Sequence, residues 1–309
     1  MKLKVTIKAI LCGVDESVVK YLDFGNGYSI EKEQLFNSEL KQTFRLDHFR
    51  TISNYYSNII DKEKNIALLN KEYEINIHDT NNSIEELTNI FDRIEAKETG
   101  YIDKTVQLIR LYSENSFNIK EIYTWIRITD GVSDEDCSNS VYPLPDTIYD
   151  DIPKLHIENK IEAKRINSFI QNGPKIIKDC LFGKESLEGI LGLYHQTYIS
   201  TIPELRFISG VTALETALVD DTNELSYRLR RNVAMLLSIN EDEYWKMNKD
   251  IKDIYNKRSK FIHNAENKGI NTELTVKTRK ILSEVIFKIF EYNVSKSELI
   301  KTLEIKGFN

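Results

Sequence analysis

The side chains with the greatest capacity for chemistry lie between residues 255 and 264, where the sequence reads Tyr-Asn-Lys-Arg-Ser-Lys-Phe-Ile-His-Asn. The segment places the guanidinium of Arg258 five residues before the imidazole of His263. An imidazole with an ordinary pKa of about 6.5 exchanges a proton at neutral pH, and a guanidinium stays charged and binds anionic oxygens. The segment therefore offers proton transfer close to anion binding.

The spacing of these two residues constrains how they act. Arg258 falls on the apolar stripe of its predicted helix and needs a partner there, for which Glu215 is suitable. His263 comes at the helix end, where a cation offsets the macrodipole. Five residues correspond to roughly 140° and 7.5 Å on an ideal helix, so the two groups do not lie on one stripe. Within one copy, the long Arg258 side chain or a distorted helix end would have to bring them together. The second way, which the geometry favours, is for two copies to meet across a twofold axis and pool both pairs in one cleft.

Other catalytic motifs are missing from the sequence. The five histidines show no metal-ligand spacing, and no glycine-rich phosphate loop or Gly-x-Ser-x-Gly motif occurs. The three cysteines, Cys12, Cys137 and Cys180, are far apart and are expected to be reduced thiols. We therefore expect no metal and no cofactor.

Composition is typical of a globular, cytoplasmic protein. The chain has 309 residues, of which 41% are hydrophobic and 29% charged, and this excludes disordered chains, collagen-like repeats and disulfide scaffolds. The first residues alternate lysine with apolar residues, unlike a signal peptide, and no apolar stretch approaches a membrane span. Trp125 and Trp245 are expected to be packing anchors.

The first half of the chain is predicted to mix strands and helices. Residues 2–10 alternate polar with apolar side chains, which indicates a half-buried strand. The segment 18–30 resembles a hairpin with its turn at Gly25–Gly27, and residues 83–96 resemble a capped helix. Further strand-like alternation occurs at residues 73–77 and 106–111.

The second half is predicted to be helical. Residues 130–153, which contain small polar residues, acids and three of the five prolines, are expected to form a loop or linker. Apolar residues then recur with helical spacing and predict five or six helices, with Asn223 as one N-cap. The expected fold class is thus α+β, with a mixed domain over residues 1–150 and an all-α bundle over residues 151–309.

Charge is distributed unevenly between the two halves. The net charge of −6 divides into −9 over residues 1–150 and +3 over residues 151–309. A slightly positive second half is compatible with a polyanionic partner, although nucleic-acid-binding domains are usually far more basic. The acidic first half is interpreted as a sensor or regulatory domain.

Three segments of the second half together resemble the ApeA-like branch of the HEPN domains. They are Thr212-Ala-Leu-Glu215, the helix from Glu224 to Leu237, and the segment from Ile254 to His263, which carries Arg-x4-His. The resemblance covers about residues 205–270. It implies an α-helical bundle that forms a homodimer, with the Arg-x4-His residues of both protomers in one active site.

The resemblance assigns roles to individual residues. Arg258 and His263 take the motif positions and are the expected catalytic residues. Ser259 stands where many members have Asn, Asp or His, and Asn264 replaces the usual glycine; both count as supporting positions. Glu215 either orients Arg258 or neutralises it within the bundle. The cations expected either to guide an RNA backbone or simply to form a solvated helix face are Lys257, Lys260, Arg228, Arg230 and Arg231.

The implied activity is metal-independent RNA cleavage, in phage defence or as a toxin. RNA supplies its own 2′-hydroxyl nucleophile, while His263 transfers a proton and Arg258 stabilises charge on the phosphate. The products are a 2′,3′-cyclic phosphate and a 5′-hydroxyl. The expected partners are RNA, a second copy of the chain, and an antitoxin or phage trigger. The alternatives are a non-catalytic HEPN module that binds nucleotide, RNA or protein, and a purely structural helical scaffold.

Overall fold

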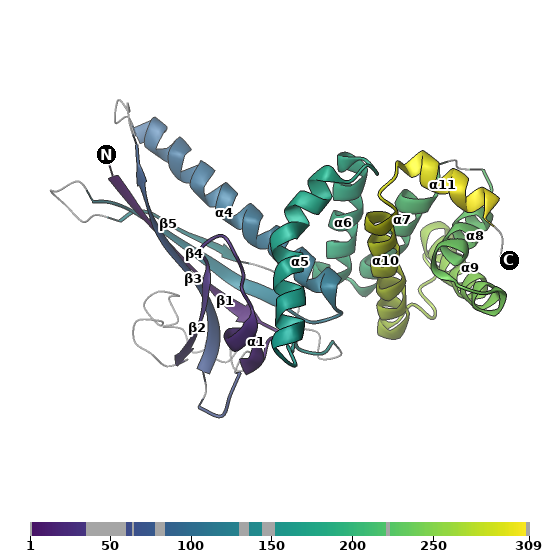
Figure 1. Cartoon of the computed structure of the whole chain (residues 1–309), viewed down its shortest axis with the longest axis horizontal. Helices are drawn as coiled ribbons and strands as arrows, with labels where there is room; N and C mark the ends of the chain where they lie inside the picture. The colour runs from purple at the N-terminus through teal and green to yellow at the C-terminus, as the bar shows by residue number, and fades with distance from the viewer. Residues whose placement is uncertain are drawn as a thin grey trace. The chain divides into compact units, whose positions relative to one another are not determined.

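The structure is a computed structural model that describes residues 2–34, 60–63, 65–77, 84–129, 136–143, 152–220 and 223–306. The chain divides into two compact units, Met1–Gly173 and Pro174–Asn309 (Figure 1). The first unit contains an antiparallel sheet with helices, and the second is helical in its described part. The α+β fold class predicted from the sequence is therefore confirmed.

The sheet of the first unit has five strands in the order β2-β3-β1-β4-β5, and all neighbouring pairs are antiparallel. The longest strands, β1, β3 and β4, occupy the centre, whereas the shorter β2 and β5 form the edges. The strand bounds are β1 (Lys2–Cys12), β2 (Ser29–Gln34), β3 (Asn65–Asn76), β4 (Asn118–Ile128) and β5 (Asp136–Pro143).

The alternation in β1 separates two environments, as the sequence predicted. Leu3 and Val5, together with the other odd-numbered residues of the strand, have no exposed surface and belong to the hydrophobic core. On the opposite face, Lys4 pairs with Glu72 of β3 at 3.1 Å. Successive side chains of a strand point to opposite faces, so a period of two buries one row and leaves the other to polar pairs.

Three helices belong to the first unit wholly or in part. They are α1 (Glu16–Tyr21), α4 (Ile84–Tyr112) and α5 (Lys160–Asp179), and Figure 1 shows α4 running along the sheet. Apolar residues of α4 and of the first half of α5 join the same core as β1. The α4 residues are Ile94, Ile102, Val106 and Ile109, and the α5 residues are Ala163, Ile166 and Ile170.

Three predictions for this half were wrong. Residues 106–111 continue α4 and do not form a strand, because Ile102, Val106 and Ile109 repeat with helical spacing. Residues 18–21 belong to α1, whose N-cap Asp15 accepts a hydrogen bond from the backbone N–H of Ser17 at 2.9 Å. Residues 136–143 form edge strand β5 inside the segment that was interpreted as a linker.

The two compact units divide at Gly173–Pro174, whereas the sequence suggested a boundary near residue 150. The difference has a physical cause. Residues 152–157 run beside the end of β1, where Leu155 N–H donates to the carbonyl of Gly13 at 2.7 Å. The first half of α5 then buries its apolar face in the core of the sheet. Both segments therefore belong to the first unit.

The second unit is built around α7, whose neighbours are α6, α8, α9, α10 and α11. The predicted stripe of α7 is confirmed, because Phe207, Val211, Leu214 and Leu218 all have no exposed surface. The helix bounds are α6 (Lys184–Ile199), α7 (Pro203–Leu218), α8 (Leu225–Leu237), α9 (Glu241–Asn264), α10 (Thr272–Tyr292) and α11 (Lys296–Ile305).

Details of the helical unit differ from the prediction. Glu224, with a left-handed φ of 53°, occupies the N-cap of α8 in place of Asn223, and no side chain caps the helix. α11 is a further helix that the apolar spacing did not predict. Neither Cys12 nor Cys180 forms a disulfide, and the Cys137 side chain lies outside the described residues. None of the helices in the described ranges combines the length and hydrophobicity of a bilayer-spanning segment.

Candidate functional site

The candidate site lies on α9, a helix with well-defined ends. The N-cap Asn240 accepts a hydrogen bond from the N–H of Glu243 at 2.9 Å, and the Glu243 carboxylate accepts one from the N–H of Ile239 at 3.0 Å. These bonds resemble a capping box, but the Glu243 carboxylate binds the N–H of the residue before the N-cap. At the other end, Ala265 adopts a left-handed φ of 54° and its N–H donates to the carbonyl of Phe261. The last helical turn therefore presents His263 to solvent.

Arg258 has the partner that the sequence analysis named. Its Nη2 lies 3.1 Å from Oε2 of Glu215 on α7, and the two side chains are 22% and 12% exposed. The guanidinium also lies 5.9 Å from the centre of the Tyr255 ring, one turn earlier on α9. Arg258 is thus held between an acid of a neighbouring helix and an aromatic ring of its own helix.

The pair between Arg258 and Glu215 leaves hydrogen-bonding capacity unused. Oε1 of Glu215 and Nε of Arg258 are both buried and have no hydrogen-bond partner among the described residues. Burial raises the pKa of Glu215, while the charge of Arg258 acts in the opposite direction. A buried polar atom without a partner carries a free-energy cost, and such atoms deserve a functional explanation.

His263 lies apart from this pair within one copy of the chain. Its side chain is exposed and forms no hydrogen bond or ion pair with any residue of the described ranges. No direct contact joins it to Arg258, in agreement with the roughly 140° that separates residues five apart on a helix. A site in which a second copy of the chain brings both groups together stays a prediction.

The two supporting positions next to the motif make no polar side-chain contact within the described structure. Ser259 is partly buried, and Asn264 is exposed in the last turn of α9. Both side chains are thus available to a ligand or to a second copy.

Two of the predicted RNA-binding cations lie near the end of α9. Lys260 is 60% exposed and lies 3.8 Å from Glu266. The ammonium group of Lys257 lies against Gly269, which has a φ of +83°, so a side chain at position 269 would collide with it. Both cations belong to the part of α9 that carries Arg258 and His263.

Two of the predicted cations on α8 have structural partners. Arg228 lies 3.4 Å from Asp220 and 3.8 Å from Glu304 of α11. Arg231 donates to the backbone carbonyl of Glu304 at 2.7 Å. These contacts fasten α11 to α8. Arg230, the third predicted cation of α8, lies between them in sequence and stacks on Tyr227, with 5.5 Å between the guanidinium and the ring centre.

Apolar side chains are exposed at the same end of the helical unit. Ile262 of α9 is 50% exposed, and so is Ile202 at the start of α7, while Leu205 is 45% exposed. The start of α7 lies beside the loop after α9, because Asn267 donates to Glu204 at 3.0 Å. Exposed apolar side chains grouped in this way are typical of interaction surfaces.

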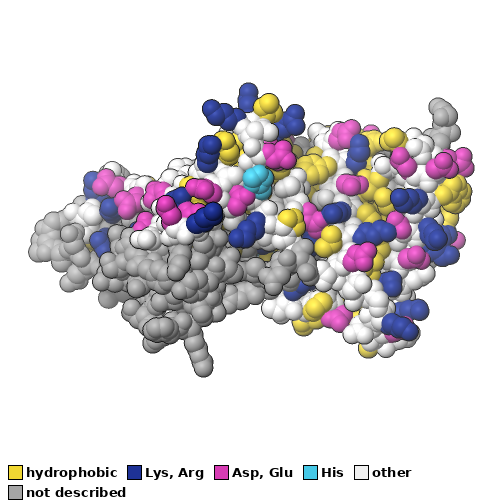
Figure 2. Space-filling model, turned by 90° about the horizontal axis from the view of Figure 1, so that it is seen from below, with side chains coloured by type: hydrophobic (Ala, Val, Ile, Leu, Met, Phe, Trp, Pro, Cys, Tyr) yellow, Lys and Arg dark blue, Asp and Glu magenta, His cyan; other side chains and the backbone are white. Residues whose placement is uncertain are grey.

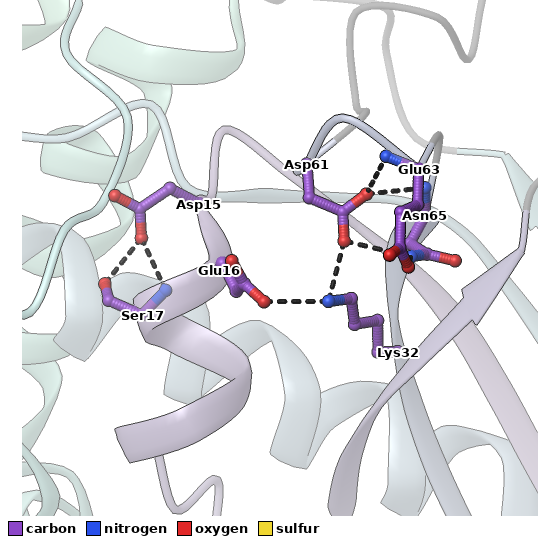
Figure 3. Close-up of polar contacts among 7 residues, drawn as sticks. All are labelled: Asp15, Glu16, Ser17, Lys32, Asp61, Glu63 and Asn65. Atoms are coloured by element: carbon purple, nitrogen blue, oxygen red, sulfur yellow. Dashed lines mark hydrogen bonds and ion pairs between the residues drawn. The ribbon is translucent and has the colours of Figure 1, made fainter.

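The polar cluster at α1, drawn in Figure 3, is a structural brace. Lys32 of β2 lies 2.7 Å from both Glu16 of α1 and Asp61. Asp61 also accepts hydrogen bonds from the N–H groups of Glu63 and Asn65. The bonds from Asn65 and Lys32 lower the pKa of Asp61. Because its neighbours already satisfy these groups, the cluster offers little to a ligand.

Charges of both signs are intermixed on the helical unit. On the face seen in Figure 2, lysine and arginine side chains alternate with acidic and hydrophobic ones and form no broad basic patch. Anion binding there depends on individual cations. Among the residues that the structure describes, no three His, Cys, Asp or Glu side chains are grouped so as to hold a metal ion.

Comparisons of the chain with protein-family models, with curated proteins and with solved structures find no match.

Proposed function

We propose that this protein is a metal-independent endoribonuclease of the HEPN type. The observation that carries the proposal is the arrangement on α9. Arg258 is held by Glu215 with its Nε unused, and the exposed His263 follows five residues later on the same helix. One group suits binding of a phosphate and the other suits proton transfer at neutral pH.

The reaction that we propose needs no nucleophile from the protein. The 2′-oxygen of a ribose attacks the adjacent phosphorus, and the bond from phosphorus to the 5′-oxygen breaks. The proton leaves the 2′-hydroxyl and a proton reaches the 5′-oxygen, with His263 as the group that accepts or donates it. Arg258 binds the non-bridging oxygens, on which negative charge increases in the transition state. The products carry a 2′,3′-cyclic phosphate and a 5′-hydroxyl.

We further propose that the active site forms between two copies of the chain. A second copy supplies the proximity of Arg258 and His263 that a single α9 lacks. The exposed apolar side chains of Ile202, Leu205 and Ile262 supply a surface for such pairing. In this proposal the protein acts in the cytoplasm against phage or as a toxin, with the first unit as the sensor of a phage trigger or the target of an antitoxin.

The test is RNA cleavage by the purified full-length protein in EDTA. Single-stranded RNA and transfer RNA are incubated with the protein, and the ends of the fragments are analysed for cyclic phosphate. We expect His263→Ala to lower the rate by about 10²–10⁴-fold, the usual contribution of a general acid or base. His156→Ala, an exposed histidine of the first unit, serves as the control. Equal cutting by His263→Ala, with circular dichroism unchanged, overturns the proposal.

One observation favours a second candidate, a non-catalytic HEPN module that binds RNA, a nucleotide or a protein. Within one copy, Arg258 already has a carboxylate partner, and His263 lies apart from it. This candidate predicts RNA or nucleotide binding without turnover, and an affinity that falls in Arg258→Ala. The cleavage experiment therefore distinguishes the two candidates directly.

A further inference from the structure

The three arginines of α8 are not equivalent. Arg228 and Arg231 are engaged with Asp220 and with both the side chain and the backbone of Glu304. Arg230 has no ion pair or hydrogen bond with any residue in the described ranges, and its Nε is buried without a partner. The middle arginine is thus the one whose donors remain available for an anion.

Arg230 is also stacked on an exposed ring. Its guanidinium lies 5.5 Å from the centre of the Tyr227 ring, and Tyr227 is 50% exposed. The same arrangement recurs on α9, where Arg258 lies 5.9 Å from the ring of Tyr255 and has a buried Nε without a partner. The two pairs differ in their acids, since Glu215 neutralises Arg258 and no described carboxylate neutralises Arg230.

The α8–α9 hairpin sets the spacing along the helices between this second pair and the candidate site. α8 ends at Leu237 and α9 begins at Glu241, and the two helices are in contact. Arg230 precedes the end of α8 by seven residues, and Arg258 follows the start of α9 by seventeen. At about 1.5 Å per residue the two arginines lie roughly 15 Å apart along the hairpin. Stacked nucleotides at about 3.4 Å each cover that span with four or five residues.

α9 has an exposed row of side chains that extends toward His263. Trp245, Lys252 and His263 lie within roughly 20° of one another on an ideal helix. All three are exposed, and Trp245 is 60% exposed, so the expectation that it packs in the core was wrong. Aromatic rings and cations along one surface are the elements that bind single-stranded nucleic acid without sequence preference.

We propose that Tyr227 and Arg230 form a binding site for single-stranded RNA next to the active site. One base stacks on the exposed face of Tyr227, and Arg230 binds a phosphate of the same strand with the donors that no acid occupies. This inference rests on the proposed function, because it states that the substrate of the nuclease is single-stranded RNA. A duplex keeps its bases stacked on one another and does not offer one to Tyr227.

The test measures RNA binding by full-length protein that carries His263→Ala. Fluorescence anisotropy follows a labelled 12-nucleotide single-stranded RNA. Tyr227→Ala is expected to weaken binding about tenfold, as the loss of one base stack does, whereas Tyr227→Phe keeps the affinity. Arg230→Gln is expected to lower the slope of log affinity against log salt by about 0.7, and Arg230→Lys preserves the slope. Tyr292→Ala, at the end of α10 where the ring is 36% exposed, is the aromatic control.

Several results overturn the inference. One is a Tyr227→Ala affinity within twofold of the parent, with circular dichroism unchanged. Others are an equal loss in Tyr292→Ala, or a duplex RNA that competes as well as the single strand. If the protein without these substitutions still cleaves RNA, only the inference fails. If that protein neither binds nor cleaves RNA, the proposed function fails with it.

Discussion

Two acids, one in each unit, lie largely out of solvent but have different numbers of hydrogen-bond partners. Glu98 of α4 is 1% exposed and accepts hydrogen bonds from Lys71 at 2.8 and 3.0 Å, from Tyr28 at 2.8 Å and from Tyr73 at 3.0 Å. Glu215 of α7 is 12% exposed and accepts one hydrogen bond, from Arg258, while its second oxygen has no partner in the described structure. Both carboxylate oxygens of Glu98 therefore have hydrogen-bond partners, whereas only one oxygen of Glu215 has one.

The two acids also differ in the direction of their pKa. Burial opposes the charge of Glu98, but the hydrogen bonds from Lys71 and Tyr28 prevail and lower its pKa. Burial prevails at Glu215 and raises its pKa in spite of Arg258. The Glu98 pair, in which every carboxylate oxygen has a hydrogen-bond partner, fastens α4 to the sheet. The Glu215 pair keeps a donor and an acceptor without partners, and these remain for another molecule. The contrast separates a structural pair from a candidate site.

The largest loss of stability is expected when Lys71, the partner of Glu98, is replaced. Lys71→Met removes one member of a buried pair and leaves Glu98 without its counter-ion, so the free energy of unfolding is expected to fall by about 3–5 kcal/mol. Urea unfolding followed by circular dichroism measures the change. Lys2→Met, which breaks the exposed pair with Glu74, is the control and is expected to lose far less. Equal losses in the two variants would contradict a structural role for the buried pair.

The second effect concerns activity. Arg258→Lys keeps a positive charge beside Glu215 but removes the planar set of donors, so the rate of RNA cleavage is expected to fall by about 10²–10³-fold. The melting temperature is expected to change little. The measurement is the cleavage rate under single-turnover conditions, with thermal unfolding on the same preparation. A variant that cuts at the original rate excludes Arg258 from the active site.

A smaller effect is expected when Glu215 becomes an amide. The folded protein holds a proton on Glu215 more tightly than the unfolded chain does, so at neutral pH its charge opposes folding. Glu215→Gln is therefore expected to cost less than about 1 kcal/mol of stability while it slows cleavage about tenfold. The lowered pKa of Glu98 has the opposite sign, and its stabilisation is lost as the pH falls through that pKa. Glu98→Gln thus destabilises the protein at pH 7, and urea unfolding of both variants tests the contrast.

The smallest effect is expected at the pair of His156 and Asp15, whose side chains are 60% and 33% exposed and lie 2.5 Å apart. The hydrogen bond to Asp15 raises the pKa of His156, and Glu158 and Glu162 act in the same direction. The stabilisation is therefore present below about pH 6.5 and is lost as the pH rises through the raised pKa. It also decreases at low pH as Asp15, whose pKa is lowered, becomes protonated.

Because the pair is exposed, it contributes less than about 1 kcal/mol. Hydrogen exchange of residues 152–157 at pH 5.5 and 8.5 measures the effect. Protection is expected to be greater at pH 5.5, after correction for the intrinsic exchange rates, and the difference should disappear in His156→Gln. A difference of the same size in that variant would contradict the assignment.

The sequence predicted correctly those helices and strands in which the apolar residues follow a single period, either that of a strand or that of a helix. The alternation in β1 and the stripe of α7 were recognised because each buries a single face. Residues 106–111 were assigned to a strand because four apolar residues among six fit the period of a strand as well as that of a helix. Only the preceding turns of α4 show that the helical period is the right one. β5 was missed because its polar sequence, Asp-Cys-Ser-Asn-Ser, becomes a strand by pairing with β4.

The candidate site shows the same limit. Arg258 and Glu215 were paired in advance, because a cation on an apolar helix face needs an acid. The difference among the three arginines of α8 was not predictable, because it depends on Glu304, which lies more than seventy residues away in sequence and reaches α8 only after α11 folds back. Contacts between distant segments, not residue types, determine which cation is free for a ligand.

The passage of α5 from one compact unit into the other limits how the protein can be dissected. A fragment that starts at residue 151 would expose Ala163, Ile166 and Ile170 without the sheet that covers them, and such fragments are prone to aggregate. A first fragment that stops at residue 150 would lose the same cover over its sheet. Pro174, which lacks an N–H and interrupts the hydrogen-bond ladder of α5, marks a better place to divide the chain.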